Sequence, residues 1–116
     1  MPHIHLETTP GLVEADRTPE ILRALVARLS GFPTIGAPGV KAYGTVYESH
    51  AIGEGGAPGF VHLRVEIMDG RGPSLVQEMA DGMYAELKAQ FAQSLGSGAA
   101  KATMELREMA SPTYRK

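Results

Sequence analysis

Phe60-Val61-His62-Leu63-Arg64-Val65-Glu66-Ile67-Met68 is the clearest β-strand in the sequence, because its apolar and polar side chains alternate. A period of two is typical of a strand that buries one face. The apolar face comprises Val61, Leu63, Val65 and Ile67, and the polar face comprises His62, Arg64 and Glu66. The glycine-rich stretch 69–73 that follows predicts a sharp turn.

The periodicity changes after this turn, which predicts a helix and then a last strand. Ser74 with Gln77 matches a capping box at the helix start. Residues 95–98 (Leu-Gly-Ser-Gly) should end the helix, and residues 102–109 alternate again. The helix carries an apolar stripe made of Leu75, Val76, Met79, Ala80, Met83, Leu87 and Phe91.

The first half of the chain predicts the same order of elements. Residues 2–7 alternate as a strand does, Thr18 is a suitable N-cap, and Pro19 suits the first helical position. Residues 40–50 favour a second strand, followed by a glycine-rich loop at 53–59. The first helix has its own apolar stripe, formed by Ile21, Leu22, Leu25, Val26 and Leu29.

These elements predict an α+β fold, in which residues 1–116 form one domain with the order β-α-β-β-α-β. Two similar βαβ halves suggest a four-stranded sheet with both helices on one face. The opposite face is mixed in character and either meets water or packs on another subunit, which favours an oligomer. That face carries His3, His5, His62, Arg64 and Glu66.

Composition excludes several classes of function. The net charge is −2 and no cluster of Lys or Arg occurs, so no nucleic-acid or anionic-membrane partner is expected. Cysteine is absent, which rules out disulfides and thiolate chemistry. No apolar run is long enough to span a membrane and no signal-peptide pattern is present, so we expect a cytoplasmic protein.

Pro2 is the first candidate catalytic residue. Removal of Met1 would leave the Pro2 nitrogen as a free secondary amine, whereas attached Met1 keeps it an amide without basicity. A free α-amino group has a pKa of about 7.7–8.0, and burial lowers it toward the range that suits proton transfer. The alternative is a Met-Pro start with no chemistry attached, because proline is well tolerated at the first residue of a strand.

Arg71 and Lys41 are candidate binding residues for an anionic substrate. Arg71 lies between two glycines at a strand-to-helix turn, and its guanidinium suits a carboxylate. Lys41 begins the predicted second strand and could add positive charge. The alternative for both is an exposed side chain with no ligand.

His3, His5 and His62 raise the alternative of a metal site. Residues i and i+2 of a strand share a face, and a neighbouring strand could supply a third ligand. Histidines at a subunit interface are the main interpretation, and no metal is expected.

Three segments of the chain resemble the 5-carboxymethyl-2-hydroxymuconate isomerase family of the tautomerase superfamily. They are Met-Pro-His-Ile at residues 1–4, Gly-Phe-Val-His-Leu at 59–63, and Gly-Arg at 70–71 before a long helix. The resemblance implies two βαβ units, a homotrimer, and active sites near the subunit boundaries.

The resemblance also implies roles for particular residues. Pro2 would be the proton-transfer base, and Arg71 would bind substrate carboxylates. A second family arginine is replaced here by Lys41, which keeps the charge but loses the bidentate fork. The family usually passes from Gly-Arg directly into Ser or Thr, whereas Gly72 and Pro73 intervene here.

The resulting hypothesis is an isomerase that moves a proton in a small, anionic, unsaturated 2-hydroxy or 2-oxo acid. No cofactor is needed, because the conjugated substrate delocalises the charge. Two alternatives stay open at this point: another proline-dependent tautomerase, hydratase or decarboxylase, and a non-catalytic oligomeric binding module.

Overall fold

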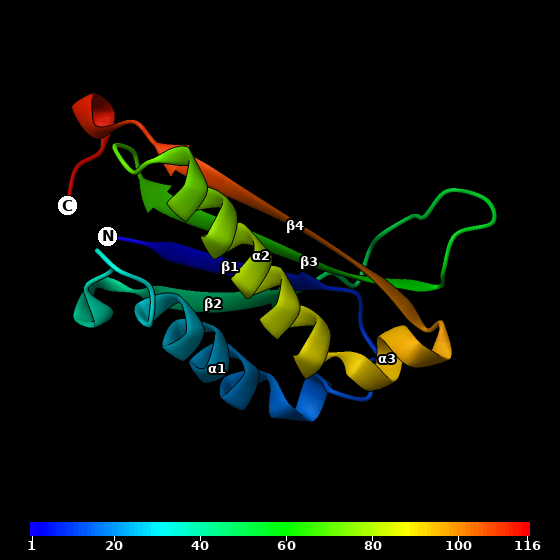
Figure 1. The fold of residues 1–116 in the computed structure, drawn as a ribbon. Helices are drawn as coiled ribbons and strands as arrows, with labels where there is room; N and C mark the ends of the chain where they lie inside the picture. Colours follow the sequence, from blue (N-terminus) through cyan, green and yellow to red (C-terminus); the bar gives the residue numbers. More distant parts are fainter.

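The computed structural model describes all residues 1–116 and contains one four-stranded sheet covered by helices on one face (Figure 1). The strand order is β2-β1-β3-β4. Central β1 and β3 are antiparallel, and each edge strand runs parallel to its neighbour. This arrangement confirms the predicted α+β fold. The elements are β1 (His3–Thr8), η1 (Ala15–Arg17), α1 (Thr18–Ser30), η2 (Ala37–Gly39), β2 (Lys41–Val46), β3 (Gly59–Met68), α2 (Pro73–Gln90), α3 (Ala92–Ser97), β4 (Ala100–Met109) and η3 (Ser111–Thr113).

The core lies between the sheet and the two long helices. Alternate residues of the central strands are buried, as the period of two predicts. Each fully buried apolar side chain contributes about 1.5–3 kcal/mol relative to exposure. The sheet supplies Ile4, Leu6, Val61, Leu63, Val65 and Ile67, and the helices supply Ile21, Leu25, Leu29, Met79, Met83 and Leu87.

Both predicted helix caps are wrong. Arg17 is the N-cap of α1, and Thr18 already lies inside the helix, where its hydroxyl donates to the Ala15 carbonyl at 2.7 Å. Gly72 precedes α2, and no side chain caps that helix. Pro73 starts α2 ahead of Ser74, because proline has no N–H to satisfy and its fixed φ suits the first turn.

Strand pairing explains two other differences from the sequence prediction. β2 ends at Val46 and not near residue 50, because its partner β1 ends at Thr8. β4 begins at Ala100, two residues earlier than predicted, because it pairs with Gly59 at the start of β3.

The second helix is also interrupted, which the sequence did not predict. α2 ends at Gln90, and Phe91 adopts a non-helical conformation while burying its ring. The separate α3 ends at Ser97, and its C-cap residue Gly98 has a φ of +81°, which favours glycine. None of the helices combines the length and apolar character that a membrane span requires.

Candidate active site

A cavity of about 320 Å³ lies where β1 begins and β3 ends. The antiparallel register sets His3 opposite Glu66, so the residues before β1 and after β3 meet at this end of the sheet. The segment between α1 and β2 closes the cavity. Its lining consists of Met1, Pro2, Thr34, Ile35, Gly36, Pro38, Gly39, Met68 and Arg71.

Pro2 is buried in this lining, and its backbone is fixed. Its carbonyl accepts a hydrogen bond from the Lys41 N–H at 3.1 Å, which extends the pairing of β1 with β2. The Met1 side chain packs against Gly39, where an added Cβ would lie only 2.9 Å from the Met1 sulfur. While Met1 is attached, the Pro2 nitrogen is an amide.

Arg71 enters the cavity from a turn that requires glycine. Gly70 has a φ of +99°, a conformation that side chains rarely adopt. The guanidinium donates to the Met68 carbonyl at 2.8 Å, to the Thr34 hydroxyl at 2.8 Å and to the Thr34 carbonyl at 3.0 Å. These bonds hold the group in place and leave one N–H on each terminal nitrogen for a ligand.

Thr34 is a site residue that sequence reasoning missed. Its φ of +71° is an outlier for a β-branched residue, and both of its polar groups contact Arg71. Nothing in the surrounding Phe-Pro-Thr-Ile-Gly sequence distinguishes this residue from an ordinary loop position.

Lys41 stands at the margin of the site. It is the first residue of β2, its side chain is exposed, and it does not line the cavity. The structure therefore brings Pro2 and Arg71 together in one cavity lining and leaves Lys41 outside it.

The electrostatic environment disfavours a protonated amine at this end of the sheet. Burial lowers the pKa of the Met1 amino group. Three nearby cations lower this pKa further: Lys116, Lys41 and Arg71. An amine here is therefore more readily neutral than one in water.

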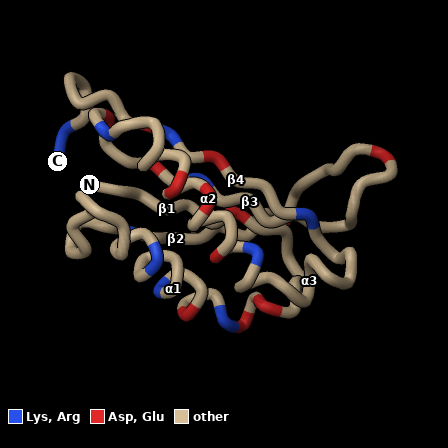
Figure 2. The backbone as a smooth tube through the Cα atoms, viewed as in Figure 1, with Lys and Arg blue, Asp and Glu red and all other residues tan.

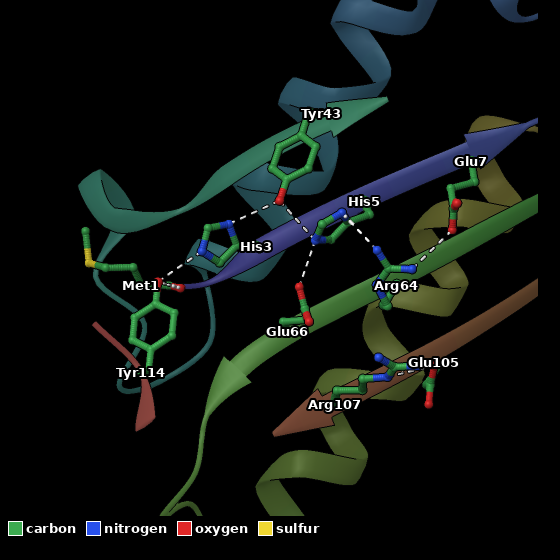
Figure 3. Close-up of polar contacts among 10 residues, drawn as sticks. All are labelled: Met1, His3, His5, Glu7, Tyr43, Arg64, Glu66, Glu105, Arg107 and Tyr114. Carbon is green, nitrogen blue, oxygen red and sulfur yellow. Dashed lines mark hydrogen bonds and ion pairs between the residues drawn. The ribbon is translucent and has the colours of Figure 1, made fainter. Parts of the chain in front are cut away.

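The last six residues of the sequence also reach this end of the molecule. The sequence pattern gave no role to them, since they show no periodicity. The Tyr114 hydroxyl lies 3.3 Å from the Met1 carbonyl and 3.0 Å from His3 Nε2 (Figure 3). A second cavity, of about 230 Å³, is lined by Met1, Met68, Ser111, Tyr114 and Lys116.

The three histidines of the metal hypothesis contact protein groups, and His3 and His5 share the Tyr43 hydroxyl. His5 Nε2 lies 2.7 Å from a Glu66 carboxylate oxygen, whereas His62 contacts Thr103 at 2.8 Å. His3 contacts the hydroxyls of Tyr43 and Tyr114. No group of three potential metal-ligating side chains is arranged to hold an ion.

Three larger hollows lack a comparable arrangement. One of about 350 Å³ between α2 and β4 has Asp81 as its only charged side chain. One of about 640 Å³ beside α1 has an apolar lining whose only charged side chain is Arg23. One of about 410 Å³ near the far end of β1 includes Glu7 and His62, but Glu7 is held by Tyr47 and Arg64. Only the cavity between β1 and β3 combines the start of the chain with a fixed guanidinium.

Solved structures share this fold over nearly the whole chain. A 5-carboxymethyl-2-hydroxymuconate isomerase from Deinococcus radiodurans R1 is 30% identical, with a TM-score of 0.88 over 99% of this chain and 87% of that one. A 5-carboxymethyl-2-hydroxymuconate delta-isomerase is 17% identical, with a TM-score of 0.81 over 100% and 87% of the two chains. A fused wild-type 4-OT symmetric trimer is 18% identical, with a TM-score of 0.76 over 98% and 90%.

No curated protein sequence matches the chain. The family model described as "5-carboxymethyl-2-hydroxymuconate isomerase" matches residues 2–116. The resemblance stated from the sequence is thereby confirmed, and the chain belongs to the 5-carboxymethyl-2-hydroxymuconate isomerase family.

Proposed function

We propose that this protein is a cofactor-independent isomerase of an unsaturated 2-hydroxy or 2-oxo acid with two or three carboxylates. The observation that carries the proposal is the cavity lined by both Pro2 and Arg71. A buried amine beside a fixed guanidinium supplies a base and an anion-binding group in one place. Membership of the isomerase family supports the same reaction class.

The reaction begins after Met1 has been removed. The neutral Pro2 nitrogen takes a proton from a carbon or an enol oxygen of the bound substrate. The electron pair left behind spreads over the conjugated system as a dienolate. Pro2 then returns the same proton to a distant carbon, so the substrate is isomerised and the amine is neutral again.

Arg71 binds a substrate carboxylate and stabilises the dienolate. Its remaining N–H groups on both terminal nitrogens match the two oxygens of a carboxylate. Because Met68 and Thr34 already hold the guanidinium, little reorganisation is needed when charge develops. Lys41 contributes through its positive field, which favours the anionic intermediate.

We also propose that the protein assembles as a homotrimer through the sheet face that the helices leave uncovered. This face carries a continuous set of polar contacts that link His5 to Glu66 and Arg64 to Glu7 (Figure 3). Exposed apolar side chains gather along edge strand β2 and the loop after it, as expected of a surface that packs on another subunit. They are Tyr43, Val46, Tyr47 and Ile52.

The test uses protein whose intact mass shows that Met1 is absent. We expect Pro2→Ala to lower kcat by about 10²–10⁴-fold on a 2-hydroxymuconate-type substrate, followed by ultraviolet absorbance. Arg71→Ala should lower kcat/KM by about 10²–10³-fold. Arg71→Lys should restore only part of that loss, because lysine keeps the charge without the fork.

Arg23→Ala is the matched control, because Arg23 is exposed on α1 and lies outside the cavity. Full isomerase activity in both Pro2→Ala and Arg71→Ala would contradict the mechanism. Retention of Met1 in the native host would favour a non-catalytic binding module.

A further inference from the structure

The last six residues form a folded segment that packs against the start of the chain. Asp69 anchors this segment, because its side chain accepts from the Ser111 N–H at 3.1 Å and its N–H donates to the Met109 carbonyl at 3.0 Å. The segment turns through η3 and runs back toward residue 1, so both chain ends lie at the same end of the molecule (Figure 1).

Tyr114 fixes the segment directly on Met1. Its hydroxyl donates to the Met1 carbonyl at 3.3 Å and contacts His3 Nε2 at 3.0 Å. Removal of Met1 takes this carbonyl away, and His3 Nε2 remains as the partner of the Tyr114 hydroxyl. A substrate oxygen bound beside the Pro2 amine can then take the place of the Met1 carbonyl as a partner of this hydroxyl.

Two cavities meet at Met1, which belongs to the lining of both. The cavity of about 320 Å³ that holds Arg71 and the cavity of about 230 Å³ that holds Lys116 are both lined by Met1 and Met68. We infer that removal of Met1 joins the two spaces along Met68. One site then has a guanidinium on one side and an ammonium on the other.

We propose that Tyr114 and Lys116 form the second half of the substrate site and bind the carboxylate farther from Arg71. This inference rests on the proposed function for the position of the reacting carbons beside Pro2. The occupant is an elongated dicarboxylate whose two acidic groups lie on opposite sides of the carbons that exchange the proton. The segment thereby selects doubly charged over singly charged acids.

The charge distribution at the chain ends fits this proposal. The last two residues of the sequence are Arg and Lys, and the backbone there ends close to the start of the chain (Figure 2). The positive charge of Lys116 is the largest charge effect on the pKa of the Met1 amino group, after burial. Lys116 also lines the same cavity as Met1, which places it beside a ligand bound at Pro2.

The experiment compares Lys116→Gln with Arg115→Gln in protein lacking Met1. Arg115 is the matched control, because it is an exposed cation of the same segment that bonds only to the Pro112 and Tyr114 carbonyls. We expect Lys116→Gln to raise KM for a dicarboxylate substrate about tenfold with little change in kcat. The half-amide of that substrate, which lacks the distal charge, should be unaffected.

A second measurement does not depend on turnover. Binding of adipate, a saturated dicarboxylate, and of hexanoate is measured by titration calorimetry. Wild type should bind adipate about tenfold more tightly than Lys116→Gln does, and Tyr114→Phe should weaken adipate binding severalfold. Wild type and all the variants should bind hexanoate equally weakly, because hexanoate has no second carboxylate.

The outcomes separate this inference from the proposed function. Absence of adipate binding, or equal adipate binding by wild type, Lys116→Gln and Arg115→Gln, overturns the inference even if the protein is an active isomerase. Weaker adipate binding by Lys116→Gln with unchanged binding by Arg115→Gln supports the inference even if no tested substrate is isomerised, in which case the proposed function fails separately.

Discussion

At the scale of a single residue, Thr34 combines a strained backbone conformation with hydrogen bonds to Arg71. Its left-handed conformation costs about 1–3 kcal/mol for a residue with a branched Cβ. The hydrogen bonds from Arg71 to its hydroxyl and carbonyl offset that cost. These hydrogen bonds therefore hold the guanidinium in one orientation before any ligand arrives.

Pro2, the proposed base, is a second single residue with a testable effect, because its protonation makes kcat/KM depend on pH. Only neutral Pro2 accepts a proton, so kcat/KM should rise with pH as the amine deprotonates. Burial and the neighbouring cations that lower the pKa of the Met1 amine should act on Pro2 in the same direction. We expect a midpoint below about 7.7–8.0, the pKa of an exposed α-amino group.

Lys41→Gln tests the electrostatic part of this expectation. Loss of one positive charge should raise the pKa of Pro2 and move the midpoint of the kcat/KM profile to higher pH. Lys101→Gln is the control, because this exposed lysine lies on β4 at the end paired with the start of β3. An unchanged midpoint in Lys41→Gln would contradict the role assigned to its charge.

At the scale of the elements, the buried carboxylate of Glu14 links the segment before η1 to α3. Glu14, which is 3% exposed, lies just before η1 and accepts hydrogen bonds from the Ser94 hydroxyl and backbone N–H in α3. Burial alone would raise the pKa of Glu14, but these hydrogen bonds outweigh that effect and the pKa is lowered. The ionised carboxylate thus holds the connection between β1 and α1 against α3.

We expect Glu14→Gln to lower the free energy of unfolding by about 1–3 kcal/mol at neutral pH. Since the folded pKa is depressed, the advantage of wild type is full above the unfolded pKa of about 4.3 and is lost as pH falls through the folded value. Urea unfolding at a series of pH values measures this difference. Glu20→Gln, on the exposed surface of α1, is the control; an equal wild-type advantage at acidic pH would argue against the assignment.

The proposed trimer belongs to the scale of the whole molecule. Light scattering should give three times the 12.3 kDa mass of one chain. Tyr43 is 43% exposed on edge strand β2 and pairs with His5 on the uncovered sheet face, so Tyr43→Asp should shift the protein toward monomers by placing a charge in the contact. Val13 is 61% exposed before η1, so Val13→Asp is a control that introduces the same charge and should leave the mass unchanged.

Local patterns predicted most of the fold, because each element carries its own periodicity. The alternating apolar and polar side chains of residues 60–68 form one buried and one half-buried face of β3, as predicted. The helix starts were less predictable, since Thr18 and Ser74 are good capping residues that the chain does not use as caps. Strand ends depended on the length of the partner strand, which local sequence does not reveal.

The candidate site was only partly predictable for a related reason. Pro2 and Arg71 were recognisable by residue type and by resemblance, and the antiparallel register of β1 and β3 brings them to one cavity. Thr34 and Tyr114 act through contacts with residues distant in sequence. No local pattern marks such contacts.

The closeness of the two chain ends has a practical consequence for recombinant work. An affinity tag fused at either terminus would emerge beside Met1 and Tyr114 and would crowd the cavity under assay. The exposed loop around residues 51–56 projects from the opposite end of the sheet (Figure 1). An internal tag inserted there would leave both termini in their natural form for kinetics.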